Sequence, residues 1–330
     1  MRILPLALVL SALAVSVPPP AGPSPAARLT GAAPVPASQP PAAGPAPLRW
    51  AFAGAYRETA VRMLAAGCPY ATWAAQGRHF LSFDPAGDGR AVEVLGDLAT
   101  ASRIAVLVPG VGTTLADFDR GLGGVPRRAP GVQARALFEH LSKRYPHTAV
   151  IAWLGYDPPE GLGTAAATYG RARAGAAALV AFVRDLLRQR PGLAGPAGHQ
   201  AGGAGAVTLI GHSYGALVAG LAAPDLPAVR DVITLGAPGI GAGHAADLGG
   251  ARVWSALAPT DWIRRIPEVR FLGVGLGRRP SNPGFGAFPL PTDGVAGHDY
   301  YLTPGSATLR AVGDVILSGV ARHDATGDVS

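Results

Sequence analysis

The fold is decided by the stretch Val207-Thr208-Leu209-Ile210-Gly211-His212-Ser213-Tyr214-Gly215-Ala216-Leu217-Val218. Residues 207–210 are mostly apolar and predict a buried strand, and the small and apolar residues after the Gly-x-Ser-x-Gly turn predict a helix. Strand, tight turn and helix in this order are the context of a nucleophile elbow, which presents a serine hydroxyl at the top of a sheet. We therefore predict that Ser213 is a nucleophile.

The two glycines of this turn have a physical explanation. The turn holds the serine backbone in a strained conformation, and a side chain at Gly211 or Gly215 would clash. The amide of Tyr214 begins the helix and is predicted to point to the place where a negatively charged oxygen develops. The alternative is an ordinary serine in a glycine-rich turn, because the pentapeptide by itself is a weak signal.

The sequence around this stretch alternates between strand and helix patterns. Residues 79–83 and 91–95 are short strand patterns joined by turn-forming residues 84–89, which predicts an antiparallel hairpin. The whole pattern predicts an α/β fold, in which a doubly wound, mostly parallel sheet has helices on both faces. Buried strands are also predicted at 103–108, 148–153, 229–235 and 252–258, and helices at 48–66, 134–144, 165–190 and 306–318.

The N-terminal part of the chain differs in composition from the rest. Residues 1–17 carry one arginine and then an unbroken apolar run, which predicts a signal peptide or a short anchor. Residues 18–47 are rich in proline and alanine and predict a disordered linker, so a single folded domain is predicted at 48–325. We expect a secreted or cell-envelope protein, with membrane association at the N-terminus if the leader is kept. The 48–66 helix is predicted to pack at the domain edge, with apolar residues Trp50, Ala53, Val61, Leu64 and Ala65 at helical spacing.

Composition excludes several classes of function. The 330 residues carry a formal net charge of +7, but basic residues form no long run and do not alternate with aromatics, so nucleic-acid binding is not expected. Cys68 is the only cysteine, which excludes an intramolecular disulfide and a cysteine zinc cluster. The glycine-rich residues 202–205 precede a strand and therefore make no phosphate-binding loop. We predict no cofactor and no metal.

A serine nucleophile needs a base that accepts its proton and an acid that orients the base. Asp261 follows the second predicted strand after the elbow, and His298 lies in a later glycine-rich loop. Both positions belong to the carboxyl edge of the sheet, and the order Ser, Asp, His is that of α/β-hydrolases. We predict that His298 is the general base and that Asp261 orients it.

Other acids and histidines are weaker candidates. Asp247 follows a strand and stays open as an alternative acid. Asp225 and Asp231 precede the 229–235 strand or lie near its start, at the opposite edge of the sheet. Asp299 is the neighbour of the base in sequence, and neighbours rarely face each other. His212 lies inside the elbow, where packing is the simpler interpretation.

Several short segments together resemble the α/β-hydrolase superfamily and, within it, an uncharacterised bacterial family. Besides the elbow, they are Val108–Thr113, Trp153–Pro159, Gly236–Gly239, Asn282–Ala287 and Gly297–Tyr301. The resemblance covers most of residues 103–310 and implies a Ser–His–Asp hydrolase fold, without a substrate.

The oxyanion hole is predicted from the amide of Tyr214 and one amide of the loop after the 103–108 strand. Val111 is the first choice and Gly112 the second. One such donor stabilises a transition state by roughly 3–4 kcal/mol. Residues 273–291 are rich in Gly, Pro, Arg and aromatic side chains and are the best candidate for a small cover over the site.

These residues predict an exported serine hydrolase that acts on a small-molecule ester or lipid-like substrate. The same triad could also pass the acyl group to an alcohol, which would make the protein an acyltransferase. The other class of function is a binding protein of the cell envelope that keeps the fold without catalysis. The presence of all three triad residues argues against that alternative.

Overall fold

The computed structural model describes residues 45–193 and 206–318, which belong to one compact unit. The predicted leader at 1–17 and residues 18–44 of the predicted linker lie outside this range. The same holds for residues 319–325 at the end of the predicted domain. Within the described residues, none of the helices combines the length and the apolar character needed to cross a bilayer.

An eight-stranded sheet forms the centre of the unit, in the order β1-β2-β4-β3-β5-β6-β7-β8. The β1–β2 and β2–β4 pairs are antiparallel, and the other neighbours are parallel, so the predicted hairpin and mostly parallel sheet are confirmed. The strands are β1 (His79–Asp84), β2 (Arg90–Leu95), β3 (Arg103–Val108), β4 (Thr148–Leu154), β5 (Ala206–His212), β6 (Val229–Leu235), β7 (Arg252–Ala256) and β8 (Phe288–Pro289).

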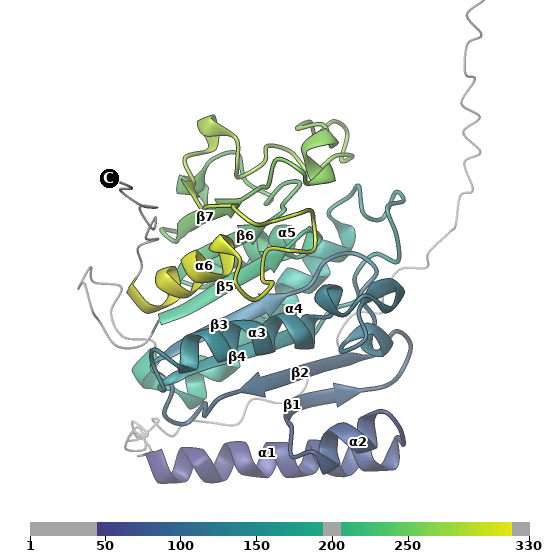
Figure 1. Ribbon diagram of the computed structural model, residues 1–330, viewed down its shortest axis with the longest axis vertical. Helices are drawn as coiled ribbons and strands as arrows, with labels where there is room; N and C mark the ends of the chain where they lie inside the picture. Colours follow the sequence, from purple (N-terminus) through teal and green to yellow (C-terminus); the bar gives the residue numbers. More distant parts are fainter. Residues whose placement is uncertain (1–44, 194–205, 319–330) are drawn as a thin grey trace, which may run out of the picture. The chain divides into compact units, whose positions relative to one another are not determined.

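Helices cover both faces of the sheet, as predicted (Figure 1). α4 and α5 pack on one face, and α3 and α6 pack on the other. α1 contacts β1 at the edge of the sheet. The helices are α1 (Pro45–Ala65), α2 (Tyr70–Ala75), α3 (Pro130–Ser142), α4 (Gly170–Gln189), α5 (Tyr214–Ala222) and α6 (Ala307–Ser318).

The central strands are buried on both faces, because alternate residues of a strand point to opposite sides. In β3, Ile104 and Val106 join the core under α4 and α5, while Ala105 and Leu107 join the core under α3 and α6. This explains why β3 is an unbroken apolar run in the sequence instead of an alternating one. The core fixes the carboxyl ends of the strands, where the predicted site residues lie.

The predicted packing face of the N-terminal helix is wrong. Trp50, Val61 and Leu64 are exposed, whereas Phe52 and Met63 are buried. Thr59 is buried with them, so the buried side chains recur at helical spacing on the opposite face of α1. A short aromatic-containing helix, α2, also follows α1 and was not predicted.

The long predicted helix begins later than expected, at Gly170 instead of residue 165. The hydroxyl of Tyr214 accepts a hydrogen bond from the Ala172 amide at 3.1 Å and donates to the Thr168 carbonyl at 2.8 Å. Amides in the first turn of a helix lack partners within the helix. The Tyr214 hydroxyl supplies such a partner to the Ala172 amide and so helps to fix the start of α4.

The segment predicted as a small cover, residues 273–291, contributes to the sheet. Phe288 and Pro289 form β8, which pairs in parallel with Trp254 and Ser255 of β7. A strand of two residues carries too little pattern to be predicted from sequence. The rest of the segment consists of turns and one short 3₁₀ helix, at Pro283–Phe285.

Candidate active site

Ser213 occupies a tight turn between β5 and α5. Its backbone has φ 55° and ψ −125°, a region that residues other than glycine rarely adopt. A Cβ atom at Gly211 would lie 2.3 Å from the Cα of Ala216, and one at Gly215 would lie 2.2 Å from the carbonyl oxygen of Val108. Both glycines are therefore required sterically, in agreement with the prediction from the sequence.

The elbow is held against the end of β6 and the loop after β3. The Ser213 amide donates to the carbonyl of Leu235, the last residue of β6, at 2.9 Å. On the other side, a Cβ atom at Gly110 would lie 2.8 Å from the Cβ of Ser213. The first glycine of the β3 loop thus allows the backbone to approach the predicted nucleophile closely.

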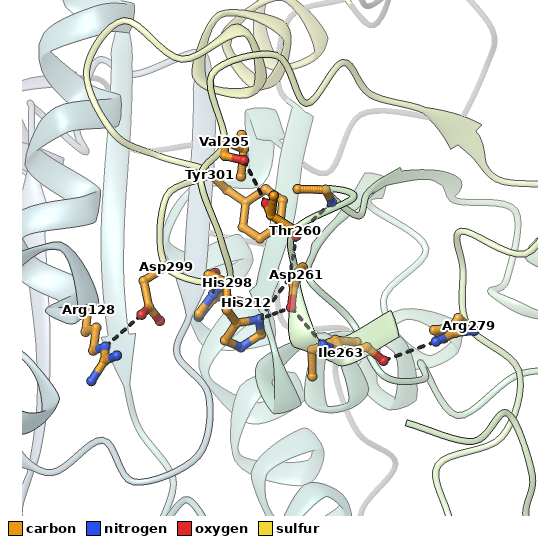
Figure 2. A network of polar contacts seen from close by, with 11 residues as sticks. Arg128, His212, Thr260, Asp261, Ile263, Arg279, Val295, His298, Asp299 and Tyr301 are labelled. Atoms are coloured by element: carbon orange, nitrogen blue, oxygen red, sulfur yellow. Dashed lines mark hydrogen bonds and ion pairs between the residues drawn. The ribbon is translucent and has the colours of Figure 1, made fainter. Parts of the chain in front are cut away.

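Asp261 and His298 form a hydrogen-bonded pair (Figure 2). The Nδ1 atom of His298 lies 3.0 Å from both carboxylate oxygens of Asp261. Because an ionised carboxylate only accepts hydrogen bonds, Nδ1 carries the proton and Nε2 is left to accept one. The structure thus brings together two of the predicted residues in the geometry of an oriented base.

The carboxylate of Asp261 is buried and fully engaged. Its Oδ1 accepts the Ile263 amide at 2.8 Å, and its Oδ2 accepts the Tyr301 hydroxyl at 2.5 Å. Burial by itself would raise the pKa of Asp261, but the hydrogen bond and charge of His298, with the bonds from Tyr301 and Ile263, lower it. Asp261 therefore remains an anion beside the base.

Gly236 connects this pair to the elbow. It has φ +58°, and a Cβ atom there would lie 2.7 Å from Oδ2 of Asp261 and 2.8 Å from Nδ1 of His298. The preceding residue, Leu235, is the one whose carbonyl holds the Ser213 amide. All three predicted triad residues therefore converge on the end of β6. The sequence alone assigned no role to Gly236. Its close approach to Asp261 and His298 in the structure reveals that role.

His212 lies beneath the base instead of acting as one. Its Nε2 lies 2.8 Å from the carbonyl oxygen of His298, and the two rings are 4.7 Å apart between centroids. Since a carbonyl only accepts, Nε2 carries the proton. Burial and the nearby His298 lower the pKa of His212 to about 4. The neutral ring therefore holds the His298 backbone in place at ordinary pH.

The low pKa of His212 makes stability depend on pH. Between pH 6.5 and 4 the unfolded chain binds a proton at this side chain and the folded protein does not, so stability falls with falling pH, by up to about 3 kcal/mol. His212→Gln retains a donor but does not titrate. We expect its free energy of unfolding, from urea denaturation at pH 7, 5.5 and 4, to change less with pH than that of the wild type. Equal slopes for the two proteins would contradict this assignment.

Tyr301 was not predicted as a site residue, although it belongs to the Gly297–Tyr301 segment that resembles the α/β-hydrolase superfamily. Its hydroxyl accepts the Ala258 amide at 3.1 Å and donates to Asp261, and its side chain is buried. Burial, and next the hydrogen bond to Asp261, raise the pKa of Tyr301 well above its usual value. The neutral phenol therefore positions the acid. In the sequence, only its place three residues after His298 hinted at such a role.

Tyr301→Phe is expected to lower both stability and activity. The Ala258 amide loses its acceptor, which costs about 1–3 kcal/mol, and Asp261 loses one of the donors that fix it. We expect kcat for an ester to fall about tenfold, because the base is held less firmly. Urea denaturation and steady-state kinetics measure the two effects. Tyr300→Phe is the matched control, since Tyr300 offers its ring face to Arg127 and its phenol has no part in this network; equal behaviour of the two variants would refute the role of Tyr301.

The predicted oxyanion donors differ in their surroundings. Tyr214 is the first residue of α5, so its amide belongs to the group that has no partner within the helix. The Gly112 amide instead donates to the Pro159 carbonyl at 2.7 Å, which argues against it as a donor. Val111 remains the candidate from this loop. The Tyr156 hydroxyl donates to the carbonyl of Pro109, at the start of this loop, at 2.7 Å.

The alternative acids are engaged elsewhere. Asp247 accepts the amides of Gly243 and His244 and caps a short helix, so it is not the partner of His298. Asp299 points away from its neighbour and forms an ion pair with Arg128 (Figure 2). Three other aspartates also form ion pairs with arginines: Asp225 with Arg184, Asp231 with Arg252, and Asp157 with Arg171.

Among the described residues, no group of three or more His, Cys, Asp or Glu side chains is arranged to hold a metal ion. A surface groove of about 450 Å³ lies along α4 and the far end of α5, and it is lined by Arg173, Ala177, Arg184, Leu221 and Asp225, among others. Because Ser213 precedes the opposite end of α5, this groove is separate from the triad.

Comparisons with known proteins agree with this architecture. A family model described as alpha/beta hydrolase matches residues 84–271, a range that includes Ser213 and Asp261. The uncharacterised protein Rv2079 of Mycobacterium tuberculosis is 33% identical over 270 residues, which cover 72% of this chain and 39% of that protein. The uncharacterised protein Rv0963c of the same species is 31% identical over 235 residues, covering 66% of this chain and 82% of that protein.

Solved structures of low sequence identity are also similar. The esterase PE8 has a TM-score of 0.40 at 16% identity, covering 67% of this chain and 94% of that one. A dienelactone hydrolase from Anabaena variabilis has a TM-score of 0.40 at 18% identity, covering 74% of this chain and 98% of that one. The chain spans about two fifths of the length of Rv2079 and most of the length of Rv0963c.

Proposed function

Since the chain belongs to the α/β-hydrolase family, we propose that it is a serine hydrolase that cleaves ester bonds. The observation that supports this best is the hydrogen-bonded pair of Asp261 and His298, which meets the strained Ser213 turn at the end of β6. A strained backbone persists only where the surrounding structure enforces it, and such strain is concentrated at functional sites.

In the proposed reaction, Nε2 of His298 accepts the proton of the Ser213 hydroxyl while the oxygen attacks the ester carbonyl. The negative charge that develops on the carbonyl oxygen is stabilised by the amides of Tyr214 and Val111. His298 then returns the proton to the departing alcohol, leaving an acyl group on the serine. Water, deprotonated by the same base, releases the acid and restores the enzyme.

Asp261 acts on the base and does not exchange protons itself. Its carboxylate keeps Nδ1 of His298 protonated, so Nε2 is the nitrogen that is free to accept the serine proton. It also stabilises the positive charge on the ring in each transition state. The bonds from Tyr301 and Ile263 hold the carboxylate in the orientation that this requires.

We further propose that the protein is exported and that its substrate is a small ester or a lipid-like molecule. The apolar run at residues 3–17 supports export, and the substrate class rests on the proposed triad. Mass spectrometry of the protein recovered from culture medium and from the cell envelope tests export. A mature chain that begins near residue 18 is the expected result, and retention of the full chain in the cytoplasm would contradict it.

Labelling with a fluorophosphonate probe tests the proposed function. The wild type should be labelled, and Ser213→Ala should not, because the probe reacts only with an activated serine. Asp247→Asn is the control variant and should label like the wild type. Failure of the folded wild type to react would refute the proposal and favour a binding protein that keeps the fold without catalysis.

A further inference from the structure

A short hairpin projects from the chain between β7 and β8; we call residues 269–274 the apolar hairpin. The Phe271 amide donates to the Val274 carbonyl at 2.8 Å, and the Val274 amide donates back to Phe271 at 2.9 Å. The two residues between them, Leu272 and Gly273, have φ values of 48° and 85°. This pattern is a type I′ turn, which requires positive φ at both central positions.

The side chains of the apolar hairpin are turned to solvent. Leu272 is 88% exposed and Phe271 is 75% exposed. Val269 and Val274 are also more than half exposed. Four large apolar side chains on one short protrusion form an exposed apolar patch, and such patches on soluble domains mark sites of interaction.

Leucine is an unfavourable residue for the tip of this turn. Type I′ turns favour Asn-Gly, because asparagine tolerates positive φ and most other side chains are strained there. At 88% exposure, Leu272 makes few contacts within the fold that could compensate for the strain. Leu272 therefore combines a positive φ with a side chain that faces solvent.

The apolar hairpin lies at the carboxyl edge of the sheet, where the candidate active site is. Val274 forms a β-bridge with Thr168, and the Gly275 amide donates to the Ala167 carbonyl at 2.8 Å, so the hairpin rests on the loop after β4. The chain reaches it from Asp261 through a short helix whose first residue, Trp262, has its ring 5.0 Å from that of His298. Figure 1 shows the green loops that follow β7 above that strand, at the side of the sheet opposite β1.

The residues that flank the apolar hairpin are strongly basic. Residues 262–279 contain five arginines and a single acid, Glu268. Arg279 already neutralises Glu268, with contacts at 2.6 and 3.0 Å. Arg264, Arg265 and Arg270 are exposed, and the guanidinium of Arg270 lies over the ring of Tyr169. The apolar tip therefore has one exposed arginine within the hairpin and two more in the preceding segment of the chain.

We propose that the apolar hairpin docks the protein on an anionic lipid bilayer. Phe271 and Leu272 enter the boundary between headgroups and acyl chains, while the exposed arginines contact the acidic headgroups. A second copy of the chain fits less well, because a symmetric contact between two hairpins would bring like charges together. Docking at this place would bring the Ser213 edge of the sheet near the membrane surface, but the inference concerns binding and does not depend on the proposed esterase function.

The test uses the full chain with the Ser213→Ala substitution, so that binding is measured without catalysis. It should co-sediment with vesicles of phosphatidylglycerol and phosphatidylcholine more than with pure phosphatidylcholine, and less at high salt. Leu272→Asn should lower binding to the anionic vesicles about tenfold, because one buried leucine is lost from the membrane contact. This variant suits the type I′ turn, so its melting temperature should be unchanged or higher. Leu64→Asn, which removes an exposed leucine from α1, is the matched control and should bind like the parent.

A second measurement reports the tip directly and is independent of any binding by the N-terminal leader. In a Cys68→Ser background, an environment-sensitive fluorophore is attached through Leu272→Cys or, as the control, through Leu64→Cys. Only the fluorophore at position 272 should shift to shorter wavelength on anionic vesicles. Absence of that shift would overturn the proposal. So would a soluble dimer that Leu272→Asn dissociates, since the hairpin would then bind a second copy.

Discussion

Replacing Ser213 by alanine is expected to lower kcat for ester hydrolysis roughly 10⁵–10⁶-fold, the loss that follows when the nucleophile of a triad is removed. The fold should remain intact, because alanine differs from serine only by the hydroxyl and meets the same backbone strain at φ 55°. The amide of residue 213 would still donate to Leu235. Steady-state kinetics on a p-nitrophenyl ester measure the loss of kcat, and circular dichroism of the same samples checks that the fold is intact.

A double substitution distinguishes a triad from a set of independent residues. His298→Ala alone should lower kcat about as much as Ser213→Ala, since the serine is unreactive without its base. The double variant should be no slower than either single variant, because residues that act as a unit are not additive. Losses that multiply in the double variant would show that the two side chains act separately, and the proposed mechanism would be wrong.

Much of the fold could be predicted because the pattern of apolar residues repeats the pattern of burial. β3 and β4 are buried on both faces and therefore appear as unbroken apolar runs. The elbow could be predicted because steric constraints select glycine at positions 211 and 215. Asp261 and His298 could be chosen because residues at the carboxyl ends of parallel strands share one edge of the sheet.

The remaining features depend on contacts between distant residues and leave no local pattern. The packing face of α1 was predicted wrongly, because the helix carries apolar residues on both sides and only the sheet edge decides which are buried. The Gly112 amide could not be excluded as an oxyanion donor without knowing that Pro159 accepts its hydrogen bond. The partners of Arg78 could not be predicted from local sequence either, because Glu93 and Asp119 are 15 and 41 residues away from it.

The support of the proposed triad is likewise a property of the folded chain. Tyr301 bonds to the carboxylate of Asp261, and His212 bonds to the backbone carbonyl of His298. Neither residue type at its position implies such a role, because a tyrosine or a histidine near a catalytic residue is more often a packing residue. Their roles follow from hydrogen bonds to Asp261 and to the His298 carbonyl.

Asp261→Asn is expected to lower kcat roughly 10³–10⁴-fold with little change in structure. Because the Ile263 amide donates to Oδ1, the asparagine oxygen must take that position, and its NH₂ group then replaces Oδ2. There it faces the Tyr301 hydroxyl, which can turn to accept, and Nδ1 of His298. Nδ1 of His298 lies 3.0 Å from both side-chain positions; in the arrangement in which it accepts from the NH₂ group, the ring proton moves to Nε2 and the base can no longer take the proton of Ser213.

The predicted loss of activity therefore comes from the wrong tautomer of His298. The pH dependence of the activity distinguishes this cause from a loss of packing. At high pH, hydroxide can compete as the base, so the activity of Asp261→Asn should rise with pH beyond the range where the wild type is constant. Asp247→Asn is the matched control, since that carboxylate caps a short helix and has no contact with His298. If Asp247→Asn lost activity and Asp261→Asn kept it, the acid of the triad would be assigned to the wrong residue. If Asp261→Asn unfolded instead, the hydrogen bonds that three residues donate to its carboxylate would be needed for stability before they are needed for catalysis.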